Sequence, residues 1–427
     1  MDHIHKKYKN GLNVFMVNLP DAESVLFTIA VKVGSRYETP KINGISHFLE
    51  HLFFKGSTAY PNPTDISEIV DAVGGDFNAS TSKELTEYYI KAEKRHFDLI
   101  FDVLSDMVLN PLFNEAEIDK ERGVVIEEMN MYQDNPASQV ETNLEKLMWP
   151  KSSLGWEILG TKEVIKNLTR QQIFDYKDKY YQPSNIILGI SGNFDRKHAL
   201  EKIQKTWAVL PNKKTPTYKK IIDGQTKPLL AVDNRPSAQQ AHLALGFKSF
   251  PHNHSKNAAA FLLANILGGS MSSRLFVAIR EQKGLAYYLH ASNSPYFNTG
   301  NFTIHAGVKI ENALEAVKEI LGELRKIRSD RVSEIELRRA KDYVRGKLTL
   351  AQEDRHRRLD WIMDHFAFSG KIKTMEEFYK KIEAVTAGDI HKVASEIFQN
   401  NRMSLALIGP FKNKKEFEKE LHLKKNF

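Results

Sequence analysis

The two halves of this 427-residue chain can be aligned with each other, and this repeat constrains the fold more than any other feature of the sequence. Residues 47–56 align with 260–269, with Phe, Leu and Gly in matching positions. Residues 185–192 align with 403–409, and both segments are short apolar runs typical of strands. The chain is therefore predicted to contain one fold built twice in tandem.

Length and composition place a boundary between the two halves. A chain of 427 residues exceeds the roughly 250–300 residues at which a single hydrophobic core stops growing, so two domains are expected. Residues 210–228 are rich in Pro and Lys and lack periodicity, which is typical of a linker. We predict an N-terminal domain at residues 1–212, a linker at 213–228 and a homologous C-terminal domain at 229–427.

Hydrophobic periodicity predicts both helices and strands in each half. Residues 25–33 are apolar and β-branched like a strand, and the segment 9–12 is typical of a turn between strands. Thr64 is expected to cap the second helix. The clearest helices are predicted at residues 44–56, 64–73, 96–110, 114–131, 257–267 and 333–349. The fold class is therefore α+β.

The pentapeptide His47-Phe48-Leu49-Glu50-His51 places three polar side chains on one side of a helical turn. Residues four apart stack one turn over the other, and a residue three after the first projects alongside them. Two imidazoles with an adjacent carboxylate can bind zinc and activate water, and the pattern is the metalloprotease motif H-E-x-x-H in reverse order. Alternatively, the apolar residues of this segment make a core-facing helix, and neighbouring groups satisfy the histidines.

A catalytic zinc needs a third protein ligand and an open position for water. Glu121 and Glu128 are seven residues apart, so on a helix they share a face across two turns. Val124 and Val125 lie between them and are expected to anchor that helix, whereas Glu127 points about 100° away and is expected in solvent. The segment therefore offers a carboxylate as the third ligand.

Together these motifs resemble the insulinase or pitrilysin family of zinc peptidases, whose pattern is H-x-x-E-H followed by E-R-x-x-V-x-x-E. The resemblance implies that His47, His51 and Glu128 hold one zinc ion per chain. It also implies that Glu50 is the general base and that Glu121 is a supporting acid of the catalytic site. The implied fold is a mixed β-sheet backed by helices, an α/β roll, present twice.

The resemblance extends over both halves of the chain. In the second half, Arg280 is followed seven residues later by Tyr287, and family members use such a pair to bind substrate near the scissile bond. From the residues alone, Arg280 would be a surface charge and Tyr287 a half-buried strand aromatic. Other segments that match the family pattern are 34–38, 74–81, 159–161 and 267–275.

A sheet edge is the expected place for substrate. Asn78 and Ala79, in the segment 76–80, match positions at which the family adds the substrate as an extra strand. Pairing along an edge gives affinity through the backbone with little sequence preference. An ordinary sheet edge without this role is the alternative.

Composition excludes several classes of protein. The chain has no cysteine, which excludes disulfides, thiolate zinc ligands and a cysteine nucleophile. No stretch approaches the roughly 18 apolar residues of a membrane span, and residues 1–10 are polar, so a cytoplasmic protein is expected. The net charge of +8 is scattered and lacks aromatic interleaving, so no nucleic-acid partner is expected.

Three functions follow from these observations. The first is a zinc endopeptidase that cleaves short or unfolded peptides inside a closed chamber. The second is a non-catalytic binding or assembly subunit of the same fold, which usually has a decayed zinc motif, whereas this motif is intact. The third is a zinc-stabilised structural protein, which would need a fourth protein ligand and gives Glu50 no role.

The oligomeric state follows from the resemblance. The chain is similar to the short, two-domain subfamily that includes the mitochondrial processing peptidase subunits and bacterial relatives, in which two chains enclose the chamber. Since this chain carries both the zinc motif and the Arg280/Tyr287 pair, we predict a homodimer. Light scattering at micromolar concentration should give twice the chain mass, and a fully active monomer would contradict the prediction.

Overall fold

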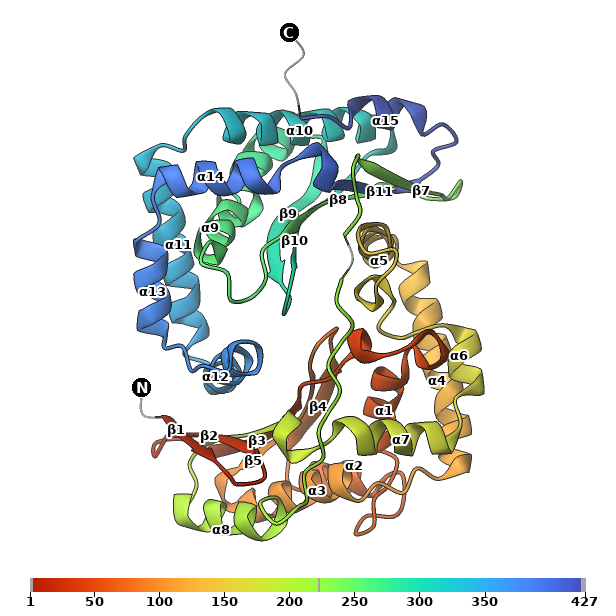
Figure 1. Ribbon diagram of the computed structural model, residues 1–427, viewed down its shortest axis with the longest axis vertical. Helices are drawn as coiled ribbons and strands as arrows, with labels where there is room; N and C mark the ends of the chain where they lie inside the picture. The colour runs from red at the N-terminus through yellow and green to blue at the C-terminus, as the bar shows by residue number, and fades with distance from the viewer. Residues whose placement is uncertain (1–2, 222, 424–427) are drawn as a thin grey trace. The chain divides into compact units, whose positions relative to one another are not determined.

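The computed structural model describes residues 3–221 and 223–423, and contacts divide the chain into two compact units (Figure 1). The first unit comprises Met1–Asn130, Trp156–Lys219 and Ala351–Ile372. The second unit comprises Met131–Gly155, Lys220–Leu350 and Lys373–Phe427. Each unit is therefore discontinuous in the chain, whereas the boundaries predicted above follow chain order.

The first unit is built on a six-stranded sheet with the order β1-β2-β6-β3-β5-β4. Strands β2 and β6 are parallel and the other neighbours are antiparallel, so the sheet is mixed. Strand β4 forms one edge and pairs with β5. The strands are β1 (His3–Lys7), β2 (Asn13–Asn18), β3 (Ser24–Val31), β4 (Asp76–Thr81), β5 (Thr86–Glu93) and β6 (Ile186–Gly192).

Helices pack against this sheet and enclose the main core of the first unit. The burial of apolar residues such as Phe48, Phe101 and Ile173 on their inner sides contributes most of the stabilisation, because each large apolar side chain adds about 1.5–3 kcal/mol. The helices are α1 (Ile45–Phe53), α2 (Asp65–Ala72), α3 (Phe97–Leu109), α4 (Glu115–Asp134), α6 (Lys162–Asn167), α7 (Arg170–Tyr180) and α8 (Arg196–Thr206).

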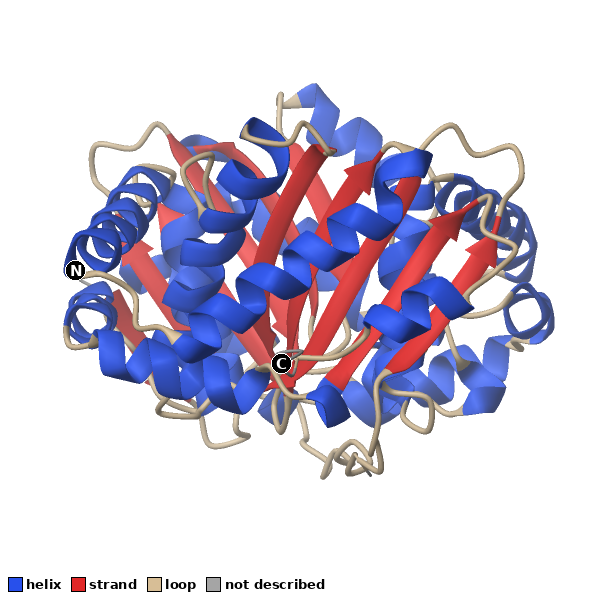
Figure 2. Ribbon diagram, turned by 90° about the horizontal axis from the view of Figure 1, so that it is seen from above, coloured by secondary structure: helices blue, strands red, loops and turns tan. Residues whose placement is uncertain are grey.

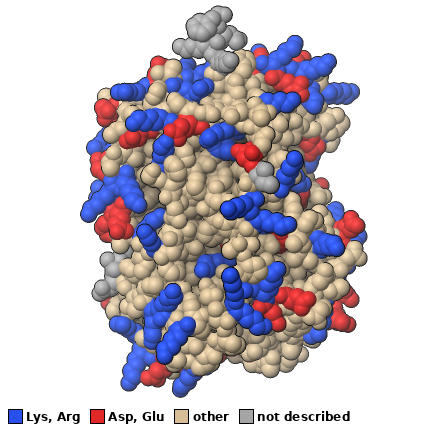
Figure 3. All heavy atoms as spheres, in the orientation of Figure 1, with Lys and Arg blue, Asp and Glu red and all other residues tan. Residues whose placement is uncertain are grey.

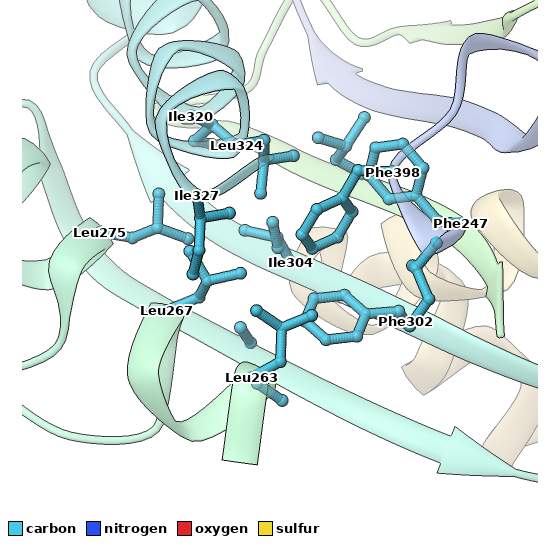
Figure 4. Packing of buried hydrophobic residues seen from close by; sticks show 14 of the residues in the cluster. Phe247, Leu263, Leu267, Leu275, Phe302, Ile304, Ile320, Leu324, Ile327 and Phe398 are labelled. Atoms are coloured by element: carbon cyan, nitrogen blue, oxygen red, sulfur yellow. The ribbon is translucent and has the colours of Figure 1, made fainter. Parts of the chain in front are cut away.

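The second unit has a five-stranded sheet with the order β7-β11-β8-β10-β9. Its core contains Phe247, Phe302 and Phe398, packed against apolar residues of the covering helices (Figure 4). The strands are β7 (Leu229–Asn234), β8 (Ala241–Ser249), β9 (Ala286–Pro295), β10 (Gly300–Val308) and β11 (Met403–Gly409). The helices are α9 (Asn257–Gly268), α10 (Ala313–Ser329), α11 (Glu334–Ala351), α13 (Met375–Glu383), α14 (Ala387–Ile397) and α15 (Lys415–Glu420).

The two sheets confirm that one fold occurs twice. Strands β2, β6, β3, β5 and β4 follow one another across the first sheet as β7, β11, β8, β10 and β9 do across the second. Each sheet has a single parallel pair, β2 with β6 in the first sheet and β7 with β11 in the second. In both cases these are the strands of the set that come first and last along the chain. The predicted α+β fold of two mixed sheets backed by helices is thus confirmed, and Figure 2 shows helices lying across the strands.

Two helices are exchanged between the halves of the chain. Helix α12 (Arg355–Ser369) comes from the second half but packs on β2 and β6 of the first unit. Helix α5 (Pro136–Met148) comes from the first half but packs on β8 and β11 of the second unit. A glycine in the sheet lets each of these helices pack close to a strand. A Cβ at Gly189 of β6 would lie 2.3 Å from Met363 Sδ of α12, and a Cβ at Gly246 of β8 would lie 2.5 Å from Met148 Sδ of α5.

The predicted helices agree with α1, α2, α3, α4, α9 and α11 to within a few residues at each end. Thr64 occupies the N-cap position of α2, as predicted, although its side chain makes no capping hydrogen bond. The backbone of Thr64 is already in the right-handed helical region (φ −97°, ψ −14°), whereas a capping hydroxyl normally requires an extended residue.

On the face that Figure 3 displays, Lys and Arg are interspersed with Asp and Glu. Across the residues that the structure describes, none of the helices combines the length and apolar character needed to cross a bilayer.

The exchanged helix generates a stability prediction. Leu359 of α12 is fully buried against the first sheet, so Leu359→Ala should lower the free energy of unfolding by about 2–5 kcal/mol, through lost burial and a residual cavity. Urea unfolding followed by tryptophan fluorescence measures this loss. Leu350→Ala, at a 63% exposed position, is the matched control and should change stability by less than about 0.5 kcal/mol. Equal effects of the two substitutions would contradict the packing of α12 described above.

Candidate metal centre

Helix α1 is held at its start by a carboxylate from outside the helix. The Glu38 side chain accepts hydrogen bonds from the backbone N–H of Gly44 (2.7 Å) and Ser46 (2.9 Å) and from Asn43 Nδ2 (2.8 Å). These bonds satisfy donors that a helix start otherwise leaves unpaired. Burial raises the pKa of Glu38 to about 7, although the hydrogen bonds oppose the rise.

A pair of glycines permits this arrangement. Gly44 has a φ of +98°, and a Cβ there would lie 2.3 Å from the carbonyl oxygen of Leu159. Gly160 has a φ of +81°, and its Cβ would lie 2.1 Å from the Asn43 carbonyl oxygen. Only glycine fits such positions at low cost, which gives a physical reason for the Leu159-Gly160-Thr161 segment singled out in the sequence.

The predicted ligands His47, His51 and Glu128 lie together in the first unit. Their ligand atoms are all within 4.8 Å of one another, and no other such trio of His, Cys, Asp or Glu occurs among residues 3–221 and 223–423. Oε2 of Glu128 lies 3.5 Å from His47 Nε2 and 3.4 Å from His51 Nε2. His47 and His51 belong to α1, and Glu128 belongs to α4.

The spacing of these atoms fits a shared zinc ion. Ligand atoms each about 2.0–2.2 Å from one tetrahedral zinc lie roughly 3.3–3.6 Å from each other. The Glu128 Oε2 atom is buried and, at its 3.4 and 3.5 Å separations, has no hydrogen-bond partner among the described residues. A buried carboxylate oxygen without a partner is costly, and a bound cation would remove that cost. The residues present therefore fit zinc.

The protonation of the two histidines differs in the metal-free chain. Burial, together with the nearby His51, lowers the pKa of His47 to about 4, so His47 is neutral at pH 7 and ready to bind a metal. Burial also opposes the charge of His51, but Glu121 and Glu128 outweigh it and raise the pKa of His51 to about 9. The contact with His51 correspondingly lowers the pKa of Glu128. Metal binding would therefore displace a proton from His51.

Glu121 contacts His51, one of the predicted metal ligands. Its Oε1 is 2.9 Å from His51 Nδ1 and its Oε2 is 3.0 Å from Lys55 Nζ. Burial acts to raise the pKa of Glu121, but His51 and Lys55 prevail and lower it. A carboxylate bound to one ring nitrogen directs the other toward the metal, and Nε2 of His51 indeed faces Glu128.

The proposed base, Glu50, lies beside the trio and contacts the sheet edge. Thr81, the last residue of β4, donates a hydrogen bond from its hydroxyl to Glu50 Oε2. Burial raises the pKa of Glu50, and the bond from Thr81 partly opposes this rise. A pocket of about 260 Å³ opens here, lined by Glu50, His51, Phe54, Lys55, Phe77, Asn78, Ala79 and Glu121.

The residues predicted to bind substrate occupy two places. Asn78 and Ala79 lie on the edge strand β4, in the pocket that also contains Glu50. Arg280 and Tyr287 belong to the second unit, where the Arg280 guanidinium lies 5.9 Å from the centre of the Tyr287 ring. Tyr287 is 74% exposed on β9, so the interpretation as a half-buried aromatic is wrong.

The burial of the residues around the predicted third ligand, Glu128 of α4, agrees with the prediction in part. Glu127 is exposed and Val125 is fully buried, as predicted. Val124 is 50% exposed, so its predicted anchoring role is wrong. Consecutive residues differ by about 100° around a helix, and the buried stripe of α4 passes through Ile118, Glu121, Val125 and Met129.

Sequence reasoning did not identify Thr81, Lys55 or Glu38 as parts of this site. Lys55 could have been found from its spacing, since it lies four residues after His51 on the same helical stripe. Thr81 and Glu38 are within segments quoted for the resemblance, but no local pattern connects them to Glu50 or to the start of α1.

The equivalent helix of the second unit has no ligands. Ala260, Leu263 and Ala264 of α9 align with His47, Glu50 and His51, and all three are buried in the apolar core of that unit. The second copy of the fold therefore has apolar core residues where the first copy has the candidate metal-binding residues.

Comparison with known proteins gives matches over nearly the whole chain. Residues 13–162 match the family model "Insulinase (Peptidase family M16)", and residues 167–344 match "Peptidase M16 inactive domain". An uncharacterized zinc protease of Bacillus subtilis, YmxG, is 35% identical over 96% of this chain and 99% of its own length. An uncharacterized zinc protease of Rickettsia felis is 35% identical over 95% of this chain and 97% of its own length.

Solved structures agree with these matches. The crystal structure of a protease from Helicobacter pylori superimposes with a TM-score of 0.90 at 26% identity, over 96% of this chain and 99% of that one. A putative M16-like peptidase from Alicyclobacillus acidocaldarius gives a TM-score of 0.83 at 20% identity, over 95% of this chain and 98% of that one, which supports the shared fold alone. Since relatives of similar length align almost end to end at 35% identity, this chain belongs to the insulinase family of peptidases, family M16, in its short two-domain form.

Proposed function

We propose that this chain is a zinc-dependent endopeptidase that hydrolyses peptide bonds in short or unfolded peptides. The observation that carries the proposal is the trio of His47, His51 and Glu128 at spacings suited to one zinc ion, with the Glu50 carboxylate beside it. Zinc proteases among the relatives support the same chemistry. Cleavage within an enclosed chamber, a homodimer and a cytoplasmic location remain predictions from the sequence.

The chain's own groups divide the chemistry between them. His47, His51 and Glu128 would hold the zinc ion, which would lower the pKa of a bound water toward about 7. Glu50 then acts as general base by accepting a proton from the attacking water and afterwards donates a proton to the leaving amine. Thr81 orients this carboxylate through its hydroxyl, and burial of Glu50 favours uptake of the proton.

The sheet edge supplies a means of holding the substrate. Strand β4 pairs on one side with β5, so a peptide can add to its other side through backbone hydrogen bonds. Asn78 and Ala79 line the pocket that contains Glu50, which supports the proposal that a strand added to this edge would lie next to the base. Because such pairing uses the backbone, the proposed enzyme accepts many sequences. Arg280 and Tyr287 are proposed to bind the substrate near the scissile bond.

A second candidate is a non-catalytic binding or assembly subunit. The match of residues 167–344 to the inactive-domain family model favours it, although Glu50 and the metal trio lie outside that segment. A binding subunit would retain zinc and bind peptides but would cleave none of them. The two candidates therefore differ in the outcome of one substitution, Glu50→Gln.

Glu50→Gln should retain zinc but lower kcat by about 10²–10⁴-fold, because the amide removes the general base and leaves all three ligands in place. Cleavage of a quenched fluorescent peptide library measures turnover, and elemental analysis of the same samples measures zinc. Zinc-loaded wild type without any cleavage would support the binding subunit instead.

Two further variants serve as controls for this experiment. Glu127→Gln removes the same charge one residue before the third ligand, on an exposed position of α4, and should leave both zinc and turnover unchanged. Glu128→Gln should lose zinc and turnover together, since it removes a ligand. If Glu128→Gln kept full zinc content, the assignment of the ligands would be wrong.

Arg280→Leu and Tyr287→Phe should each raise KM by roughly tenfold, because a hydrogen bond to substrate is worth about 1.5 kcal/mol when one partner is charged or well oriented. Initial rates over a range of peptide concentrations separate KM from kcat. Arg339→Leu, at an exposed position of α11, is the control and should change neither constant. An unchanged KM in both variants would remove the pair from the substrate site.

A further inference from the structure

Lys55 extends the series of charged and imidazole groups that joins α1 to α4. His47 and His51 lie one turn apart on α1, and Lys55 follows in the turn directly after the helix ends at Phe53. Glu121 and Glu128 lie two turns apart on α4. The contacts alternate between the helices: Glu128 with both histidines, then His51 with Glu121, then Glu121 with Lys55 at 3.0 Å. Lys55 is thus the terminal cation of the series.

The burial of Glu121 makes its cation important. Only 6% of the Glu121 side chain is exposed, and its polar partners within the described part of the chain are His51 and Lys55. A histidine that binds a metal through Nε2 is neutral and keeps its proton on Nδ1, so it gives Glu121 a hydrogen bond but no formal charge. The Lys55 ammonium then supplies the full positive charge that a buried carboxylate requires.

We propose that Lys55 is a positioning residue for the metal ligand His51 and acts through Glu121. The ammonium binds Oε2 of Glu121 and fixes the carboxylate, so that Oε1 stays in place to accept a hydrogen bond from Nδ1 of His51. The ring orientation and tautomer of His51 then present Nε2 to the metal. This inference rests on the proposed zinc site, and it assigns Lys55 an effect on metal affinity, separate from any contact with substrate.

Lys55 is also placed where it could bind substrate, and the experiment must distinguish this role from the positioning of His51. Its side chain is 31% exposed and lines the pocket with Phe54 and Phe77, so a substrate carboxylate could also reach it. A substrate-binding lysine would affect KM for acidic peptides and leave zinc affinity unchanged. A positioning lysine would affect the zinc dissociation constant measured with no peptide present.

The experiment measures the zinc dissociation constant of the full chain by competition with a chromophoric chelator, with zinc alone as the ligand. Lys55→Met should weaken zinc binding by about 10-fold, within the about 10–100-fold range found for groups that support metal ligands. Lys55→Arg should bind zinc with an affinity within about threefold of the wild type, because it keeps a positive charge next to Glu121. Lys41→Met removes the same charge from an exposed position near the other end of α1 and should have no effect.

A double-mutant cycle tests whether the effect passes through Glu121. Glu121→Gln should itself weaken zinc binding, and adding Lys55→Met to it should change affinity by less than about twofold, since the carboxylate to be neutralised is gone. Fully multiplicative effects, or unchanged zinc affinity in Lys55→Met with only KM altered, would overturn the inference. A wild type that binds no zinc would instead overturn the proposed function on which it rests.

Discussion

The packing of α1 against α4 is the interaction on which the rest of the site depends. Two imidazoles of α1 and two carboxylates of α4 contact one another across this helix pair, and Lys55, just after α1, contacts the last of these carboxylates. His47 and Glu121 are buried, and the other three groups are partly exposed. Buried charges persist only when each has a partner, so the two helices can have just one register. Apolar anchors such as Phe48 on α1 and Val125 on α4 hold the helices at the distance which that register requires.

The site also shows how rigid elements replace flexible loops in positioning catalytic groups. Glu38 and the glycines at 44 and 160 fix the start of α1, and Thr81 connects Glu50 to the end of β4. The candidate base, a metal ligand and the free sheet edge therefore share one pocket. Because helices and strands hold side chains more precisely than loops, this arrangement suits chemistry that depends on distances of a few tenths of an ångström.

The duplicated fold assigns different tasks to its two copies. In the first unit α1 directs His47 and His51 toward α4 and Glu50 toward β4. The equivalent α9 of the second unit has Ala and Leu at these positions, buried in the core of that unit. The exchange of α5 and α12 ties both halves of the chain into both units, since each sheet is covered on one face by a helix of the other half. The main core of each unit is formed within one half of the sequence, and only the two smaller clusters beneath α5 and α12 combine residues of both halves.

The sequence by itself predicted six of the helices, the repeat and the pairing of His47 with His51, because these depend on short spacings and on apolar periodicity. The choice of Glu128 over Glu121 as the third ligand came from the family resemblance. Tertiary structure alone decided the contacts between distant segments. The exchange of α5 and α12 depends on which sheet face each helix can cover, and the link from Thr81 to Glu50 depends on where β4 ends beside α1. Val124 and Tyr287 are exposed for the same reason, since burial is set by what packs opposite a residue and not by its own polarity.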